Sequence, residues 1–162
     1  YPNPVSDVLQ VEILSKQSTN LTLNIIDIKG SSNNSIFENK PLMSIQKLAI
    51  DHYLPWSLVT HDKLWNLHPI EQDANSSKSN KIADEKYLWN FTNLQYKFMH
   101  HVATLNPKYL EDYFNLFSIS KSDLLNIPNQ KFSELLSSKI TVDTEVAINL
   151  GYFTNWSYSN QD

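Results

Sequence analysis

The pattern of hydrophobic and polar positions changes along the chain. Residues 8–14 and 21–28 alternate apolar and polar positions, which favours two strands, although a helix remains open for either segment. Beyond residue 82 apolar residues recur at intervals of three and four, which predicts a helix that ends at Asn106 and Pro107, because proline cannot continue it. Three more helices are expected, around residues 109–117, 132–140 and 144–150.

In the middle of the chain, segments with the alternating pattern of strands are followed closely by a segment with the polar composition of an exposed helix. Residues 46–52 favour a strand, residues 53–63 a loop that contains a proline, residues 64–69 a short return strand, and residues 71–80 a polar helix. The order strand, strand, helix defines a ββα unit.

Composition limits the class of protein. With 162 residues, of which 41% are hydrophobic and 12% aromatic, the chain can bury one core, as a single domain or as a small domain with an appendage. No apolar run reaches the roughly 18 residues of a membrane span, and no signal peptide is recognised, so no membrane association is expected. The chain has no cysteine, which fits a reducing compartment, and we expect a cytoplasmic location.

Glycine and arginine are scarce. Gly30 and Gly151 are the two glycines, so the glycine-rich loops that bring backbone close to phosphate in nucleotide-binding folds are excluded. Gly151 is expected to close the last helix in the left-handed conformation, and Thr144 to cap its start. All 13 basic residues are lysine. A reader of DNA sequence is therefore not expected, because such proteins rely on the forked arginine side chain.

Five polar residues in the ββα unit have a distinctive spacing. Asp51 and His52 end the first strand, Asn66 follows His52 by fourteen positions, Asn75 follows nine later, and Lys78 three after that. Asn75 and Lys78 are one turn apart on the expected helix, so they project from the same face. The unit therefore gathers a carboxylate, an imidazole and an amide.

This spacing resembles that of HNH endonucleases, the ββα-metal nuclease family, over roughly residues 33–82. It is also similar to the HNH domain of RNA-guided CRISPR nucleases, and residues 145–158 resemble the C-terminal end of one branch of bacterial HNH proteins. The resemblance implies an α+β fold with a ββα-metal core. Residues 1–32 would form a β-rich N-terminal segment, and residues 83–162 a helical extension packed on the core.

The resemblance also implies a division of roles in phosphodiester hydrolysis. Asp51 and Asn75 would each give an oxygen to one divalent ion, and two oxygen ligands favour Mg²⁺ or Mn²⁺. His52 would accept a proton from the attacking water, a role that suits histidine because an unperturbed imidazole has a pKa of about 6.5. Asn66 would orient the imidazole or hold the loop that carries it.

Three further residues are expected to meet the substrate. Lys78 and Lys81 would contact phosphate, and His68 would share a strand face with Asn66 and approach the substrate. His61, beside Asp62 in the loop, could serve as a substitute metal ligand, but a solvated pair of these two residues is expected.

Two departures from the family pattern matter. Many HNH proteins have histidine where this chain has Asn75, and the weaker amide ligand predicts modest metal affinity. Many also hold a structural zinc with two cysteine pairs, which this chain lacks, so no structural zinc is expected. Packing of Phe37, Trp56, Trp65 and the C-terminal aromatic residues is expected to replace it.

The charge predicts a need for recruitment. The net charge is −4, and the obvious basic cluster beside the proposed site is Lys78, Lys81 and Lys86. Three lysines predict weak binding to DNA, with a salt-dependence slope of about −3 or shallower. A partner domain, a partner subunit or self-association is therefore expected to bring the chain to DNA, and the resemblance suggests a role in phage defence.

Two other classes stay open. The chain fits a catalytically inactive HNH-like module for binding or scaffolding, which the same sequence would encode. The start of the chain also resembles the β-rich C-terminal sorting domains of some secreted bacterial proteins, which suggests a secreted adaptor. A cleavage assay on plasmid with and without Mg²⁺ distinguishes all three classes.

Overall fold

The computed structural model describes residues 10–14, 20–24 and 34–159. Two antiparallel strands begin it: β1 (Gln10–Leu14) pairs with β2 (Asn20–Asn24), in agreement with the alternating pattern. Residues 8, 9 and 25–28 of the two expected strands lie outside the described residues.

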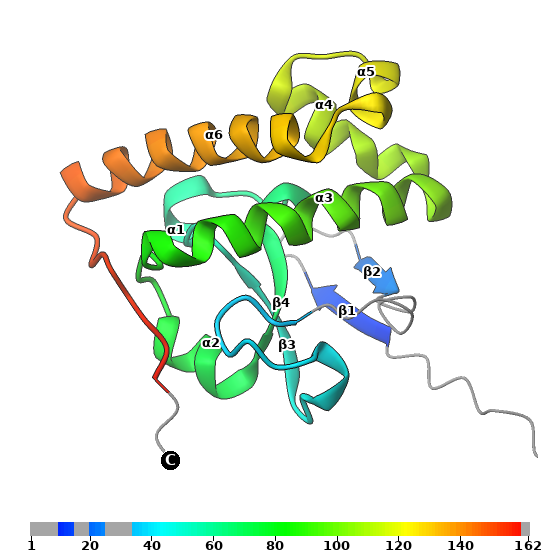
Figure 1. The fold of residues 1–162 in the computed structure, drawn as a ribbon. Coiled ribbons are helices and arrows are strands. Elements are labelled where there is room, and N and C mark those ends of the chain that lie inside the picture. The colour runs from blue at the N-terminus through cyan, green and yellow to red at the C-terminus, as the bar shows by residue number, and fades with distance from the viewer. Residues whose placement is uncertain (1–9, 15–19, 25–33, 160–162) are drawn as a thin grey trace, which may run out of the picture.

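The predicted ββα unit is confirmed, with shifted bounds. Strand β3 (Leu48–His52) pairs antiparallel with β4 (Leu67–Glu71), and helix α2 (Gln72–Lys78) follows directly and packs against both strands. In the register, Asp51 faces His68 and His52 faces Leu67. The end of β3, where the two residues of interest lie, is therefore beside the start of β4 (Figure 1).

The connection between the strands is more helical than expected. It contains the short helix α1 (Trp56–Val59) and the 3₁₀ turn η3 (Leu64–Asn66), so residues 64–66 are not part of the return strand. The side chain of Asn66 is bonded to the backbone of Leu54, a local arrangement that alternation of apolar residues does not reveal.

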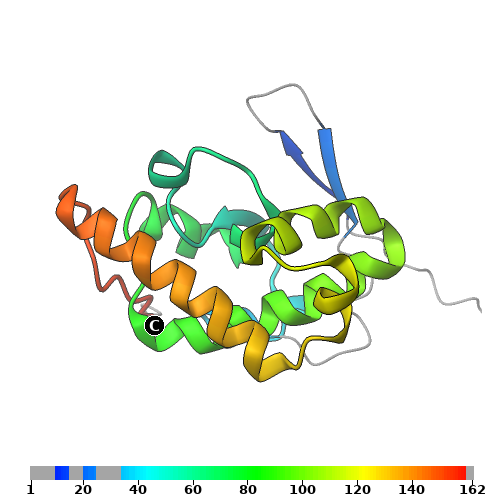
Figure 2. The same ribbon diagram turned by 90° about the horizontal axis from the view of Figure 1, so that it is seen from above.

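Helices cover one face of the ββα unit, and α3 (Leu88–Leu105) has the predicted extent. Helix α3 packs against α6 (Asn129–Asn149), and the two run side by side above the small sheet (Figures 1 and 2). The expected helix over 109–117 is divided into a 3₁₀ turn and a helix, and the helix over residues 121–126 was not expected. The remaining helical elements are η2 (Leu42–Ser44), η4 (Glu85–Tyr87), η5 (Pro107–Leu110), α4 (Glu111–Phe117) and α5 (Lys121–Asn126).

The two helices expected over residues 132–140 and 144–150 form a single helix in the structure. Helix α6 runs through Thr144 without a break, so the prediction that Thr144 caps a separate helix is wrong. Neither proline nor glycine interrupts this stretch, and buried residues continue at helical spacing from Ile140 to Ala147. Gly151 follows the helix with φ of +82°, the left-handed closing conformation that was predicted.

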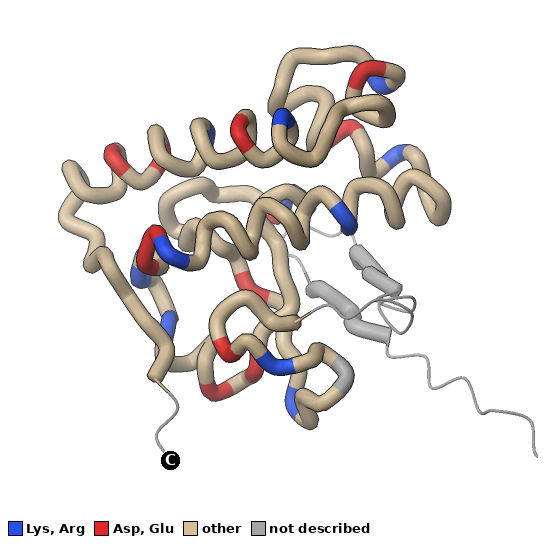
Figure 3. Tube along the Cα trace, viewed as in Figure 1, with Lys and Arg blue, Asp and Glu red and all other residues tan. Residues whose placement is uncertain are grey.

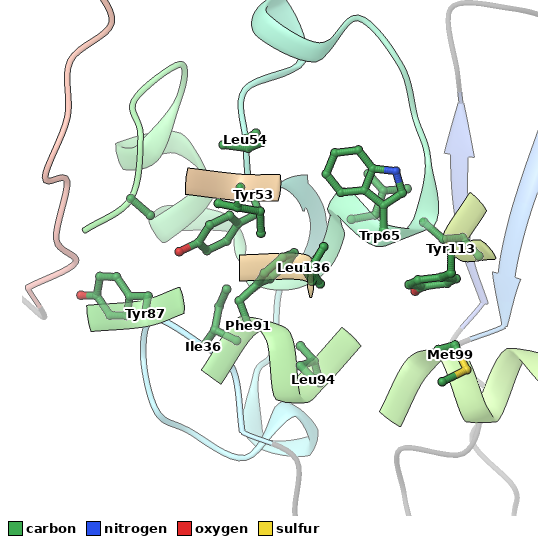
Figure 4. Packing of buried hydrophobic residues seen from close by; sticks show 14 of the residues in the cluster. Ile36, Tyr53, Leu54, Trp65, Tyr87, Phe91, Leu94, Met99, Tyr113 and Leu136 are labelled. Atoms are coloured by element: carbon green, nitrogen blue, oxygen red, sulfur yellow. The ribbon is translucent and has the colours of Figure 1, made fainter. Parts of the chain in front are cut away.

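Aromatic residues fill the core between the sheet and the helices. The rings of Tyr53 and Phe91 stack with centroids 4.0 Å apart, and both are buried (Figure 4). Phe37 meets Trp156 edge to face at 5.0 Å, so the C-terminal segment contributes to the core. Trp65 is also buried, whereas Trp56 is 43% exposed. The expected packing therefore involves Phe37, Trp65 and Trp156 but not Trp56.

The C-terminal segment is attached to the chain just after α2. Ile82 donates to the carbonyl of Phe153, and Trp156 donates to the carbonyl of Ile82. The indole of Trp156 also donates to Ser77 Oγ on α2, at 3.2 Å. These contacts link the end of α2 to a segment more than seventy residues away in the sequence. Within the described residues, no helix has the length and apolar character that crossing a membrane demands.

Candidate functional site

The loop that follows β3 is fixed by Asn66. Its side-chain oxygen accepts a hydrogen bond from the backbone N–H of Leu54 at 2.9 Å, and its amide nitrogen donates to the carbonyl of the same residue at 2.9 Å. Its own carbonyl accepts from Tyr53 N at 2.8 Å. Asn66 is fully buried. These bonds hold the loop that directly follows His52, and the role of Asn66 in catalysis stays a prediction.

The strand opposite His52 is held by a buried polar chain. Gln95 on α3 donates from Nε2 to the carbonyl of Leu67 at 2.6 Å and accepts from the Tyr113 hydroxyl at 2.7 Å. Gln95 and Tyr113 are buried, and burial raises the pKa of Tyr113, so its hydroxyl keeps its proton and remains a donor. The helical extension thus fixes the start of β4 beside His52.

A buried ion pair connects α2 to the end of β3. Lys78 Nζ lies 2.9 Å from Asp51 Oδ2 and donates to the backbone carbonyl of His52 at 2.6 Å. The side chain of Lys78 is 0% exposed and that of Asp51 is 14% exposed. The expectation that Lys78 contacts phosphate does not fit this position, because its ammonium group is buried and already occupied. Lys78 instead joins the helix to the strand.

Asn75 lies half-buried on α2, three residues before Lys78. Residues three apart lie on one face of a helix, so Asn75 is on the face from which Lys78 reaches Asp51. The convergence of Asn75 and Asp51 to within about 5 Å, which the ligand roles demand, stays a prediction.

His68 is inside the protein and not at a surface that substrate can reach. Its ring is 0% exposed, packs edge to face on Phe37, and has Nδ1 3.1 Å from the carbonyl of Pro69. Burial lowers the pKa of His68 to about 4, partly offset by Asp51, whose Oδ2 lies 4.0 Å from Nε2. His68 is therefore neutral near pH 7, and the expected contact with substrate is wrong for this conformation.

The basic cluster is smaller than predicted. With Lys78 buried, Lys81 and Lys86 remain, and Lys81 is half-buried with Nζ donating to the carbonyl of Ser77 at 2.7 Å. Lys86 is exposed, with its ammonium group 5.0 Å from the centre of the Tyr87 ring. Lysines and acidic residues are interspersed in this region and along the helices (Figure 3). The contact of Lys81 with substrate stays a prediction.

The sequence did not predict that Asp62 lies at the site. Asp62 does not form a solvated pair with His61, because its Oδ1 lies 2.9 Å from Nε2 of His52. The ring of His61 packs against Trp65, and its Nδ1 accepts from Lys63 N at 3.3 Å. No local pattern in the sequence indicates a contact that spans ten residues of loop.

One segment of the chain matches a known protein family. Residues 32–83, which include β3, β4 and α2, match the model of the HNH endonuclease family. This segment of the chain is similar to HNH endonuclease domains. No curated protein and no solved structure matches the chain.

An HNH endonuclease domain indicates nuclease activity and binding of nucleic acid, and HNH nucleases generally use a divalent metal ion. The match covers the segment as a whole and assigns no residue. Catalytic roles for His52 and Asn66 and ligand roles for Asp51 and Asn75 therefore stay predictions.

Proposed function

We propose that this chain is a metal-dependent endonuclease that hydrolyses phosphodiester bonds in DNA, as the effector part of a larger bacterial defence assembly. The observation that carries the proposal is the contact of Lys78 with both Asp51 and His52. This contact brings the face of α2 that also carries Asn75 to the strand end that carries the expected ligand and base.

The residues present fit a hard divalent ion. Asp51 offers a largely buried carboxylate that already stabilises one positive charge, the ammonium group of Lys78. Within residues 10–14, 20–24 and 34–159 no group of three or more His, Cys, Asp or Glu side chains is arranged to hold a metal. Asp51 and Asn75 would therefore supply two oxygen ligands and water the rest, as Mg²⁺ accepts. Because Lys78 shares the carboxylate, modest affinity is expected.

Hydrolysis needs a base for water and relief of charge at the phosphate. A divalent ion bound there would stabilise charge on the phosphate and on the leaving oxygen. His52 would take one proton from water as the water oxygen bonds to phosphorus and the bond to the leaving sugar oxygen breaks, with solvent giving that oxygen its proton. Asn66 holds the loop that follows His52, and Gln95 holds Leu67, the residue opposite His52 in the register, so the backbone that carries the base is fixed before substrate arrives.

The second candidate is an HNH-like module without catalytic activity, and the ion pair between Lys78 and Asp51 is the observation that favours it. An ammonium group held against the expected ligand competes with a metal ion. Failure to bind Mg²⁺ or Mn²⁺ would support this candidate.

Metal binding tests the proposal. In calorimetric titration, the wild-type chain is expected to bind Mg²⁺ or Mn²⁺, and Asp51→Ala to lose the binding, because its carboxylate is the charged ligand. Asn75→His is expected to bind and to cleave, since many HNH proteins have histidine there.

Asp73→Ala is the matched control, because Asp73 is an exposed carboxylate on α2 two residues before Asn75. Thermal unfolding of each variant checks the fold, since Asp51→Ala leaves the Lys78 ammonium without its partner. Equal Mg²⁺ affinity in a folded Asp51→Ala would overturn the ligand assignment.

Weak binding to DNA is expected of this chain alone. Each neutralised phosphate contributes about −0.9 to the slope of log affinity against log salt, so Lys81 and Lys86 together predict a slope of about −2. Fluorescence anisotropy with a random duplex, across salt concentrations, measures it. Tight binding with a slope several times steeper would mean that no recruiting partner or self-association is needed.

A further inference from the structure

The imidazole of His52 has a carboxylate partner that the expected set of site residues does not include. His52 Nε2 lies 2.9 Å from Asp62 Oδ1. The two side chains are 19% and 26% exposed, so both are largely shielded from solvent. One residue ends β3, and the other lies ten positions later, just before η3.

Asp62 is held between two anchored points of the loop. Before it, Thr60 ends α1 with φ of +56° and donates from its backbone N–H to Trp56 O at 2.7 Å. After it, the backbone N–H of Leu64 donates to Asp112 Oδ2 on α4 at 2.9 Å. Burial raises the pKa of Asp112, and the bond from Leu64 opposes that change. The loop that presents Asp62 is thus fixed from both sides.

A carboxylate beside one ring nitrogen decides where a neutral imidazole carries its proton. The nitrogen that faces the carboxylate holds the N–H, and the other nitrogen has the lone pair that accepts a proton. At His52 the nitrogen facing the carboxylate is Nε2, which leaves Nδ1 as the accepting atom.

We propose that Asp62 is a positioning residue for His52, which holds the imidazole with the proton on Nε2 so that Nδ1 accepts the proton of the attacking water. This inference rests on the proposed function, in which His52 is the base. When Nδ1 gains the proton, the ring becomes an imidazolium that still donates from Nε2 to Asp62. The role parallels that of carboxylates that orient histidines in other hydrolases.

Two simpler roles for Asp62 fit less well. A solvated surface pair would leave both side chains mostly exposed, whereas these are about three-quarters or more shielded. A metal-ligand role fits less well, because Asp62 Oδ1 is already engaged by the His52 ring, with Nε2 at 2.9 Å.

The position of the proton can be measured without any cleavage assay. In ¹⁵N NMR spectra at neutral pH, the His52 signals, assigned by their loss in His52→Ala, are expected to show the proton on Nε2. In Asp62→Ala a mixture of the two tautomers is expected. A wild-type ring with its proton on Nδ1, or an Asp62→Ala spectrum with the tautomer unchanged, would overturn the inference.

Kinetics gives the second readout. Asp62→Ala is expected to lower kcat about 10–100-fold, as loss of a group that orients a functional histidine does, with KM unchanged. Asp62→Glu is expected to restore part of kcat, and the matched control Asp143→Ala, on α6 and paired with Lys139, to leave it unchanged.

In the His52→Ala background, Asp62→Ala is expected to have no further effect, because the two residues act as a unit. A full additional loss in the double variant would show that Asp62 acts independently of His52. A wild-type chain with no cleavage at all would contradict the proposed function, and the NMR experiment would still decide the role of Asp62.

Discussion

Replacing His52 with alanine is expected to lower the rate of DNA cleavage by roughly 10²–10⁴-fold, the contribution of a positioned general base. The imidazole acts on water, so Mg²⁺ affinity is expected to stay close to that of the wild type. The side chain is part of the edge of the site and not of the hydrophobic core, so the fold is expected to persist. Initial rates of plasmid cleavage measure the effect.

The control is His101→Ala, a histidine on α3 outside the proposed site, which is expected to keep most of the activity. Calorimetry and thermal unfolding of both variants separate loss of chemistry from loss of metal or fold. If His52→Ala cleaves at the wild-type rate, the proposed mechanism is wrong.

Replacing Lys78 with alanine is expected to lower the free energy of unfolding by about 3–5 kcal/mol, the usual cost of removing one partner of a buried ion pair. The change leaves the largely buried Asp51 carboxylate without its cation and the carbonyl of His52 without a donor. It also removes a fully buried side chain between α2 and β3. Denaturant unfolding measures the loss.

Lys131→Ala is the matched control, because Lys131 pairs with Glu134 at 3.8 Å on an exposed surface of α6. That change is expected to cost at most about 1 kcal/mol. Lys78→Met keeps an apolar stem and separates the charge from the packing. A loss in Lys78→Ala no greater than in Lys131→Ala would mean that the pair with Asp51 does not hold α2 to the strand.

The sequence predicts best those helices and strands whose hydrophobic pattern repeats, over several turns of a helix or over several alternating positions of a strand. The long apolar repeat of α3 gives its bounds, and alternation gives β3. A local signal alone can mislead. Thr144 is a good capping residue, but it lies inside α6 because no neighbouring residue breaks the helix. The strand predicted for residues 64–66 is wrong because a tertiary contact outweighs the local pattern. The side chain of Asn66 bonds to the backbone of Leu54, and these residues form a 3₁₀ turn.

The site divides in the same way. The spacing in the sequence predicts that Asp51 and His52 lie close to α2, because a ββα unit has few ways to pack. It does not show which polar side chains are turned inward, so the burial of Lys78 and His68 was not foreseen. The pairing of Asp62 with His52 depends on how the loop folds back, and a sequence pattern gives no access to that.

We propose that this chain cleaves DNA with a divalent ion bound at Asp51 and Asn75. Conversion of supercoiled plasmid to nicked or linear DNA, with the chain at high concentration to offset weak binding, tests it most directly. Cleavage is expected in Mg²⁺ or Mn²⁺, with none in EDTA, recovery when the ion is restored, and almost none with His52→Ala. Equal conversion by the wild type and by His52→Ala, or wild-type cleavage that persists in EDTA, would contradict it.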